Sequence, residues 1–382
     1  MRILAIGHAF IVDTNRKVFH ALSKLPNTNV DMVLPRVWQS NLVSTIEFQE
    51  STADESIDNI YPIDVYRKGN GSFYFYHFDL FNIFRNNTYD FIYIWQEPWS
   101  ISAAQAIFFA KITSSKNAGI YLQVAQNIRK KHLTPLIPWE RFLSRSVTEY
   151  FCCSEGVRDV IRWKKLDAPD SLLSLGFDES LVKDHIHFPV KKGKITLGYI
   201  GRLSPEKGLD DLISATELYY EGNKEIQLVI AGNGPLSSKL SQYPFIKYLG
   251  VLSHKDVGEF YNQIDFCVVP SKTTKFWKEQ FGRVLIEAVA AGKITIGSNS
   301  GSIPEVMGSM DMPFVFEEGN VDQLSNLIRD VAKLIGTGEA VTIAQRSKDI
   351  VLRQYSNKAI ATKIYQTFIN KNPLNRIASS TD

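Results

Sequence analysis

Two carboxylates mark the stretch KEQFGRVLIEAVAAGK near position 280. Glu279 comes shortly before an apolar run that is typical of a helix, and Glu287 interrupts that run between Ile286 and Ala288. Burying an unpaired carboxylate costs free energy, so Glu287 needs a partner. Glu279 has two interpretations: a residue that contacts a ligand, or a helix cap that answers the free N–H groups and the positive end of the helix dipole.

Two cations follow a predicted strand earlier in the chain. In ITLGYIGRLSPEKGLDDLISA a buried strand ends at Gly201, a short loop carries Arg202 and Lys207, and an amphipathic helix follows. The carboxyl end of a parallel strand beside a helix N-terminus favours anions, and a diphosphate would suit it. The alternative is a solvated loop in which Lys207 pairs with Glu206 or Asp210.

A third motif, LVIAGNGPL, places Gly232, Asn233 and Gly234 directly after another predicted strand. Glycines there let the backbone approach a ligand closely, although the same pattern also serves any tight strand-to-helix turn. The earlier loop, with Arg202 and Lys207, has neither the spacing of a Walker motif nor that of a dinucleotide-binding fingerprint.

Composition bounds the class of protein. The chain has 382 residues, of which 44% are hydrophobic, and this length predicts two domains. Its 43 basic and 40 acidic side chains give a net charge of +3, which excludes a uniform polyanion-binding field. Three cysteines form neither a disulfide framework nor a zinc spacing, and no apolar run reaches 18 residues. We expect a cytoplasmic protein, with a peripheral position at the inner face of a membrane as an option.

The elements that would position these residues follow a regular order. Ten short apolar runs alternate with helical segments, which predicts an α/β protein with parallel sheets covered by helices. We expect one domain over residues 1–177, a linker over 178–194 and a second domain over 195–354. A helix at about 355–382 is expected to pack back onto the first domain. The aromatic-rich residues 67–84 indicate either a ligand or lipid surface or the packing of a helix on a sheet.

The order of these motifs resembles a known enzyme family. Arg-x4-Lys, G-N-G, Glu-x7-Glu with F-G after the first glutamate, and then SNSGSIPEV resemble the retaining glycosyltransferases of family 4. The first half matches more loosely, in FIYIWQEP, AQNIRKK, CSEGV and LGFD. The family has the GT-B fold, in which two Rossmann-like parallel-sheet domains face each other across a cleft.

The resemblance implies a role for each matching position. Arg202 and Lys207 would hold the donor diphosphate, Glu279 would lie near the donor sugar, and Glu287 would accept hydrogen bonds from the ribose diol. The implied catalytic residues are Glu279, Arg202 and Lys207. The implied substrate-binding and nucleotide-binding positions are Gly7, Asn127, Gly201, Gly232, Asn233, Gly234, Phe281, Gly282, Arg283 and Glu287.

The sequence also departs from the family pattern. Gly7 stands alone where many members have two glycines, so His8, Asn15 or Arg16 could face the cleft instead. Gln126 and Asn127 occupy the place where many relatives have a histidine beside the donor sugar, and neither is a useful general base.

The resemblance implies transfer of a hexose from a nucleoside diphosphate sugar to a glycan or lipid-linked acceptor in polysaccharide biosynthesis. UDP-glucose is the favoured donor and GDP-mannose its rival, and neither a metal nor another cofactor is required. The basic residues 129–131 could contact a lipid diphosphate or a membrane. A sugar-nucleotide epimerase and a non-catalytic sugar-nucleotide-binding protein are the alternatives.

Hydrolysis is disfavoured on geometry. A helix running through both glutamates would separate them by about 12 Å along its axis. The paired carboxylates of glycosidases lie only about 5–9.5 Å apart.

Overall fold

The computed structural model describes residues 1–39, 45–130, 136–182, 185–188, 194–253, 255–335 and 337–371. The chain divides into two compact units. The first unit combines Met1–Gly176 with the C-terminal segment that starts at Asn357, and the second is Phe177–Ser356. Residues 178–182 and 185–188, expected to form a linker, therefore belong to the second unit, where the buried Leu181 joins an apolar cluster with Phe260 and Ile264.

The first unit contains a seven-stranded parallel sheet in the order β11-β10-β9-β8-β1-β2-β5. Its strands are β1 (Arg2–Ile6), β2 (Asn29–Pro35), β5 (Asn59–Ile63), β8 (Phe91–Trp95), β9 (Gly119–Val124), β10 (Glu149–Cys152) and β11 (Asp170–Leu172). Apolar runs form these strands because helices cover both faces of a parallel sheet. The central register pairs Ile3 with Val30 on one side and with Phe91 on the other.

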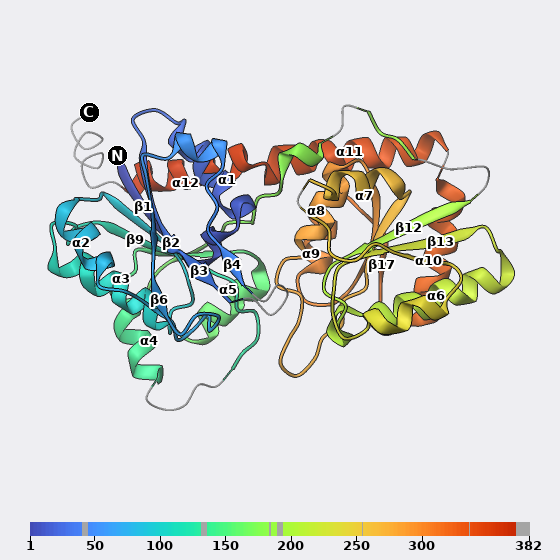
Figure 1. The fold of residues 1–382 in the computed structure, drawn as a ribbon, viewed down its shortest axis with the longest axis horizontal. Helices are drawn as coiled ribbons and strands as arrows, with labels where there is room; N and C mark the ends of the chain where they lie inside the picture. Colours follow the sequence, from blue (N-terminus) through green and yellow to red (C-terminus); the bar gives the residue numbers. More distant parts are fainter. Residues whose placement is uncertain are drawn as a thin grey trace. The chain divides into compact units, whose positions relative to one another are not determined.

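Six α-helices, two short 3₁₀ helices and two small hairpins complete the described part of this unit. The helices are α1 (Asp13–Ser23), α2 (Asp79–Asn86), α3 (Ile101–Ile112), α4 (Leu136–Ser144), α5 (Glu155–Trp163) and α12 (Asn357–Lys371). The hairpins pair β3 (Val37–Trp38) with β4 (Ile46–Glu47), and β6 (Val65–Tyr66) with β7 (Phe75–Tyr76). Helix α12 lies beside α1 (Figure 1). The Phe368 ring of α12 stacks on Phe91 of β8, with the ring centroids 4.5 Å apart.

The second unit has a six-stranded parallel sheet in the order β14-β13-β12-β15-β16-β17. Its strands are β12 (Ile195–Ile200), β13 (Ile226–Ala231), β14 (Ile246–Tyr248), β15 (Phe266–Val269), β16 (Ile294–Ser298) and β17 (Val315–Phe316). Its helices are α6 (Leu209–Gly222), α7 (Val257–Gln263), α8 (Arg283–Ala290), α9 (Ile303–Ser309), α10 (Val321–Leu334) and α11 (Gly338–Tyr355). Short 3₁₀ turns, including Pro205–Lys207, connect some of these elements.

Both sheets reverse their strand order at one position. In the first unit the chain builds β2 and β5 on one side of β1 and then places β8 on the other side. In the second unit β13 and β14 lie on one side of β12, and β15 lies on the other. Ligands of open α/β sheets bind outside the carboxyl ends of the strands at such a reversal, so β1/β8 and β12/β15 are the places where a ligand is expected.

The predicted fold class is confirmed, because each unit is a parallel sheet with helices and all ten apolar runs form strands. The aromatic-rich segment is divided: Tyr74, Tyr76 and Leu80 are buried, whereas Phe78 is exposed.

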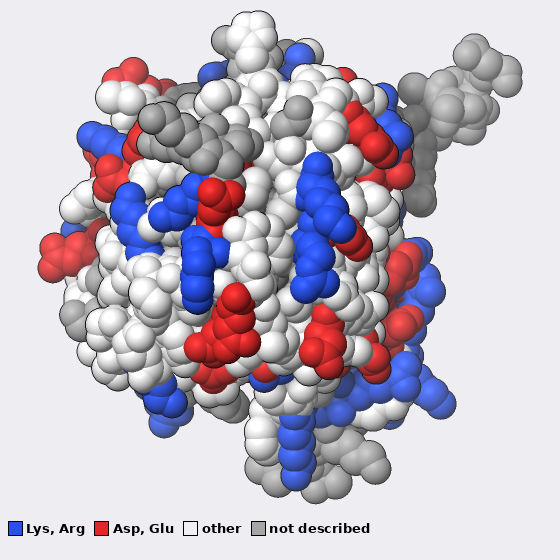
Figure 2. All heavy atoms as spheres, turned by 90° about the vertical axis from the view of Figure 1, so that its right-hand side faces the viewer, with Lys and Arg blue, Asp and Glu red and all other residues white. Residues whose placement is uncertain are grey.

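One face of the molecule shows basic and acidic side chains intermixed, without a field of one sign (Figure 2). No helix of the described residues combines the length and the apolar character that crossing a bilayer requires.

Candidate functional site

A pocket of about 240 Å³ lies at the reversal point of the second sheet. The carboxyl ends of β12 and β15 supply one wall, through Tyr199–Gly201 and Val268–Ser271. The start of α8 supplies another, through Gly282, Arg283 and Val284. Lys207 and Glu279 complete the lining. Five implied site residues therefore meet in this pocket: Gly201, Lys207, Glu279, Gly282 and Arg283.

Lys207 and Glu279 form the polar centre of the pocket. The Nζ atom of Lys207 lies 2.8 Å from Oε2 of Glu279, and the Ser271 hydroxyl donates to the same oxygen at 2.8 Å. The Lys207 ammonium also lies 4.5 Å from the centre of the Trp277 ring. A tight turn holds that ring in place, because Thr274 exchanges backbone and side-chain hydrogen bonds with Trp277. The ammonium is thus oriented by both a carboxylate and an aromatic face.

The motif SNSGS fixes the backbone of Glu279. The N–H of Ser302 donates to the carbonyl of Glu279 at 3.0 Å. Gly301 has a φ of 56°, and a Cβ placed on it would come within 2.0 Å of that carbonyl oxygen. Only glycine permits such a close approach, so this position is specified by backbone packing around Glu279.

Glu279 is not the N-cap residue of the helix that follows it. Helix α8 begins at Arg283, its N-cap is Gly282, and Glu279 lies in the preceding loop, where its side chain binds Lys207. A continuous helix through Glu279 and Glu287 does not form either, so the 12 Å spacing argument against hydrolysis does not apply. The helix does not extend back to Glu279 because the backbone of Gly282 is left-handed, with φ of 78°.

The N-terminus of α8 gives the pocket a preference for anions. The N-cap residue of α8 is Gly282, which has no side chain, and the first residues of the helix, Arg283 and Val284, line the pocket. Free N–H groups and the positive end of the helix dipole stabilise negative charge at such a position. Together with the Lys207 ammonium they form a site that a diphosphate would satisfy.

The second predicted cation, Arg202, is not part of this pocket wall. Its guanidinium lies 3.8 Å from Glu206, and its side chain is 40% exposed. The alternative of a solvated loop with a Lys207–Glu206 or Lys207–Asp210 pair is also wrong, because Lys207 pairs with Glu279. The loop therefore turns one of its two cations into the pocket and the other toward solvent.

Glu287 lies one helical turn after Arg283 on α8, outside the pocket lining. Burial raises the pKa of Glu287 to about 7, although the positive charge of Arg283 lowers this pKa in part. The negative charge of Asp178 adds to the increase. The predicted need for a partner is met in part by the Arg283 charge, and the predicted ribose contact stays a prediction.

The G-N-G loop packs against the strand end that carries the pocket. Gly232 has a φ of 132°, and a Cβ on it would lie 1.8 Å from the carbonyl oxygen of Gly201. Asn233 accepts a hydrogen bond at its carbonyl from Leu203, and Gly234 packs on the same residue. These three positions therefore pack against the loop after β12, and their predicted contact with a nucleotide stays a prediction.

Phe281 packs away from the pocket. Its side chain is buried and its ring centroid lies 5.9 Å from that of Tyr355. It anchors the loop before α8 to the end of α11 and does not line the pocket.

In the first unit, polar residues gather at the carboxyl ends of β1 and β8. The Nδ1 atom of His8 lies 2.7 Å from the Gln96 amide nitrogen, which also donates to the Tyr74 hydroxyl. Burial lowers the pKa of His8 to about 4, so the ring is neutral near pH 7. An amide nitrogen can only donate, so Nδ1 accepts and the proton resides on Nε2. Gly7 precedes His8 in extended backbone, with φ of 173°.

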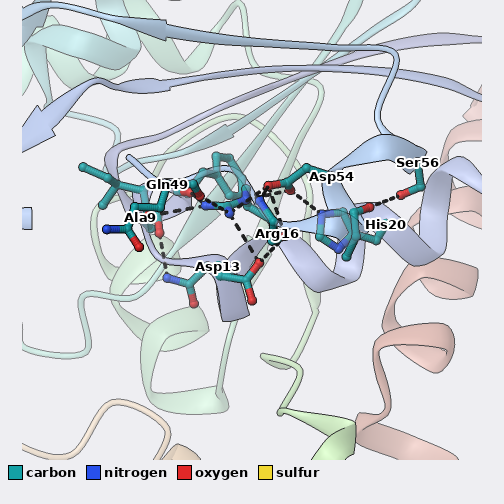
Figure 3. A network of polar contacts seen from close by, with 12 residues as sticks. Ala9, Asp13, Arg16, His20, Gln49, Asp54 and Ser56 are labelled. Atoms are coloured by element: carbon teal, nitrogen blue, oxygen red, sulfur yellow. Dashed lines mark hydrogen bonds and ion pairs between the residues drawn. The ribbon is translucent and has the colours of Figure 1, made fainter. Parts of the chain in front are cut away.

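Arg16 is buried within the first unit, contrary to the expectation that it could face the cleft. Its guanidinium binds both carboxylate oxygens of Asp54 at 2.9 Å and donates to the carbonyls of Phe10 and Gln49 (Figure 3). The side chain is fully buried. Asn15 donates to the carbonyl of Ala9 at 2.7 Å. Both residues hold the loop after β1 in shape, and Arg16 has no exposed surface to offer a phosphate.

Sequence reasoning did not assign a role to Glu97, which follows β8 closely. One of its oxygens accepts hydrogen bonds from the N–H groups of Ala125 and Gln126, each at 2.9 Å. Burial raises the pKa of Glu97 to about 7, although these N–H groups lower it in part. A glutamate just after a buried strand, in the stretch WQEP, was the available signal. Asn127, shortly beyond the end of the next strand, is buried.

The second unit contains the part of the chain that matches a known protein family. Residues 183–341 match the model of a family described as Glycosyl transferases group 1. The match lies within the second unit and covers most of it. The group 1 match covers every residue that lines the pocket. The pocket with Lys207 and Glu279 therefore lies in the part of the chain that is similar to group 1 glycosyl transferases.

Curated relatives match about half of the chain. A protein from the cps region of Klebsiella pneumoniae is 30% identical over 177 residues, which are 44% of this chain and 42% of that protein. A lipopolysaccharide 1,2-N-acetylglucosaminetransferase of Salmonella typhimurium is 27% identical over 187 residues, 45% of this chain and 47% of that enzyme. The matched part of the chain thus spans less than half the length of either relative.

Solved structures share the fold of the whole chain. A glycosyltransferase from Rickettsia africae superposes with a TM-score of 0.72 at 16% identity, covering 97% of this chain and 98% of the other. The Anabaena HepE protein in complex with UDP gives a TM-score of 0.68 at 15% identity, covering 97% and 99%. These likenesses confirm the GT-B fold class.

Proposed function

We propose that the protein is a glycosyltransferase that moves a hexose from a nucleoside diphosphate sugar to a glycan or lipid-linked acceptor. The observation that carries the proposal is the pocket at the β12/β15 reversal. There the Lys207 ammonium and the start of α8 are directed at one small volume. Such a site suits a diphosphate, and Glu279 beside it suits a sugar hydroxyl.

The arrangement supports transfer through stabilisation of the leaving diphosphate. In the retaining reaction the bond between the anomeric carbon and the diphosphate oxygen breaks, and a bond to the acceptor oxygen forms on the same face of the sugar. The acceptor proton passes to the departing diphosphate oxygen. Lys207 and the N–H groups of α8 would then counter the charge that grows as the diphosphate leaves. Neither a metal nor another cofactor is needed in this scheme.

The donor and the acceptor are the finer parts of the proposal. UDP-glucose is the first donor to test, with GDP-mannose as its rival. UDP-N-acetylglucosamine joins them, because relatives are named as N-acetylglucosaminyltransferases, and another is named as GDP-mannose-dependent. The relatives' names mention lipopolysaccharide and phosphatidylinositol, which supports a lipid-linked acceptor in polysaccharide assembly at the inner face of a membrane.

A panel of nucleoside diphosphate sugars, scored for release of the diphosphate with and without acceptor extracts, tests the proposal. We expect one donor to give release that depends on Lys207. An epimerase would instead convert the donor sugar without acceptor, and a non-catalytic binding protein would bind donor and release no diphosphate. Either result contradicts the transferase proposal.

A further inference from the structure

Helix α3 of the first unit (Ile101–Ile112) is apolar on two opposite faces. Its buried face is built from alanines and Ile107. Its outer face carries Ile101, Phe108 and Ile112, which are 38%, 58% and 54% exposed. A surface helix usually turns polar side chains outward, but here the outward side chains are larger than most of the buried ones. The outer face of α3 is therefore an exposed apolar surface.

Helix α2, which contacts α3 (Figure 1), extends this surface. Phe78, at the start of α2, is 60% exposed. Its ring centroid lies 5.0 Å from that of Phe81, which lies 5.3 Å from that of Phe109 on α3. The aromatic face is defined by six residues: Phe78, Phe81, Ile101, Phe108, Phe109 and Ile112. A contiguous apolar patch of this kind marks an interaction surface.

The charges on these helices and on the loop after α3 indicate which partner the aromatic face suits. Arg85 lies near the end of α2, Lys111 near the end of α3, and Lys116 in the loop that follows, and all three are exposed. The exposed carboxylate of Asp79, at the start of α2, is hydrogen-bonded to His77. With three cations and one carboxylate, the edge of the aromatic face has a net positive charge. An apolar face edged by cations matches the boundary between acyl chains and anionic headgroups.

We propose that the aromatic face binds an anionic lipid bilayer, with its phenylalanines among the acyl chains and its cations at the headgroups. A second copy of this chain would also cover the apolar atoms, but a symmetric contact would bring edges of like charge together. The inference rests on the proposed function in one respect only, since a lipid-linked acceptor would lie at such a surface. Binding itself requires no transfer.

Sedimentation of the full chain with vesicles tests the proposal. Vesicles of phosphatidylcholine with added phosphatidylglycerol should bind the protein, pure phosphatidylcholine should bind it less, and added salt should weaken the binding. Phe78→Ser and Phe108→Ser should each reduce partitioning by about fivefold, because each removes a half-exposed apolar side chain, and by more than tenfold together. The matched control is Phe276→Ser, which changes a 70% exposed phenylalanine of the second unit and should leave vesicle binding unchanged.

Three results would overturn the proposal: no binding to phosphatidylglycerol vesicles, undiminished binding by the double variant, or loss of binding in the control. Light scattering of the free protein supplies a further outcome. A dimer that the double variant abolishes would show that the face joins two copies of the chain. The vesicles contain neither donor nor acceptor, so failure of the proposed transfer reaction would not alter these results.

Discussion

Lys207 and Glu279 are 72 positions apart in the sequence, yet their charged groups lie 2.8 Å apart at the pocket. The ammonium is therefore held at the pocket before any ligand arrives. An ion pair of this kind restricts a flexible lysine to one region, which reduces the ordering required when an anion binds.

Replacing Lys207 by alanine should lower turnover by on the order of 100-fold, because the ammonium acts on charge that grows in the transition state. Steady-state rates with the active donor measure the effect. Lys272→Ala is the matched control, since Lys272 pairs with Asp211 and does not line the pocket. An equal loss in the control would contradict the assignment, and a comparable loss in Arg202→Ala would return Arg202 to the catalytic set.

Glu279→Gln separates binding of the sugar from binding of the diphosphate. The variant should bind the free nucleoside diphosphate nearly normally, and its turnover with the complete donor should fall because a contact to the sugar weakens. Calorimetry with the diphosphate, set beside steady-state rates, measures both. Loss of diphosphate affinity with unchanged turnover would assign Glu279 to the phosphate group.

Glu287→Gln should change how stability depends on pH. Because the pKa of Glu287 is raised from 4.5 to about 7, the folded protein keeps a proton that the unfolded chain releases in this range. Wild-type stability therefore falls as pH rises through this window. The unfolding free energy of the variant minus that of the wild type should increase by about 1–3 kcal/mol between about pH 4 and about pH 8. Urea titrations at both pH values measure it.

The same variant tests the ribose contact. If Glu287 binds the ribose diol, the binding free energies of the free nucleoside diphosphate and of the intact donor should weaken together, by about 1.5–3 kcal/mol for each hydrogen bond lost. Unchanged affinity beside the expected stability change would limit Glu287 to the interior of the domain.

Arg16→Met should destabilise the first unit by about 3–5 kcal/mol, because it leaves the buried Asp54 carboxylate without its guanidinium. Burial by itself raises the pKa of Asp54, but hydrogen bonds from His20 and Arg16 outweigh it and hold this pKa well below its usual value. The stabilisation is thus present above the ordinary aspartate pKa and disappears in acid. Urea titration checks this, with the exposed Lys24→Ala as control. A midpoint equal to that of the control would contradict the structural role.

Exhaustive chelation should leave activity unchanged, because the proposed mechanism stabilises the diphosphate with Lys207 and peptide N–H groups. The measurement is diphosphate release before and after treatment with EDTA. Loss of activity that manganese or magnesium restores would show that a metal takes part.

The strands were predictable from the sequence because they depend on local patterns, whereas the pocket also depends on the order of the strands in the sheet. Buried apolar runs specify parallel strands, and residues that follow two such strands meet at a common edge of the sheet. Lys207 and Glu279 each follow a strand of this kind, so their meeting required only the strand order.

The direction of individual side chains was less predictable. Arg202 and Lys207 belong to the same loop, and only the fold of that loop turns one of them into the pocket. Arg16 was expected to be able to face the cleft, and its burial was not predictable because its partner Asp54 lies 38 residues away in the sequence. The helix boundary at Gly282 depends on a left-handed residue that apolar periodicity does not reveal.

Helix α12 has a consequence for how the chain is made. It buries Ile360, Ile364 and Phe368 in the core of the first unit, although the whole second unit precedes it in the sequence. On the ribosome the second unit, ending at Ser356, is fully synthesised before α12 emerges. Synthesis of the first unit begins earlier, but the surface of α1 that α12 covers stays exposed until α12 is made. The first unit is therefore the later of the two to complete its core.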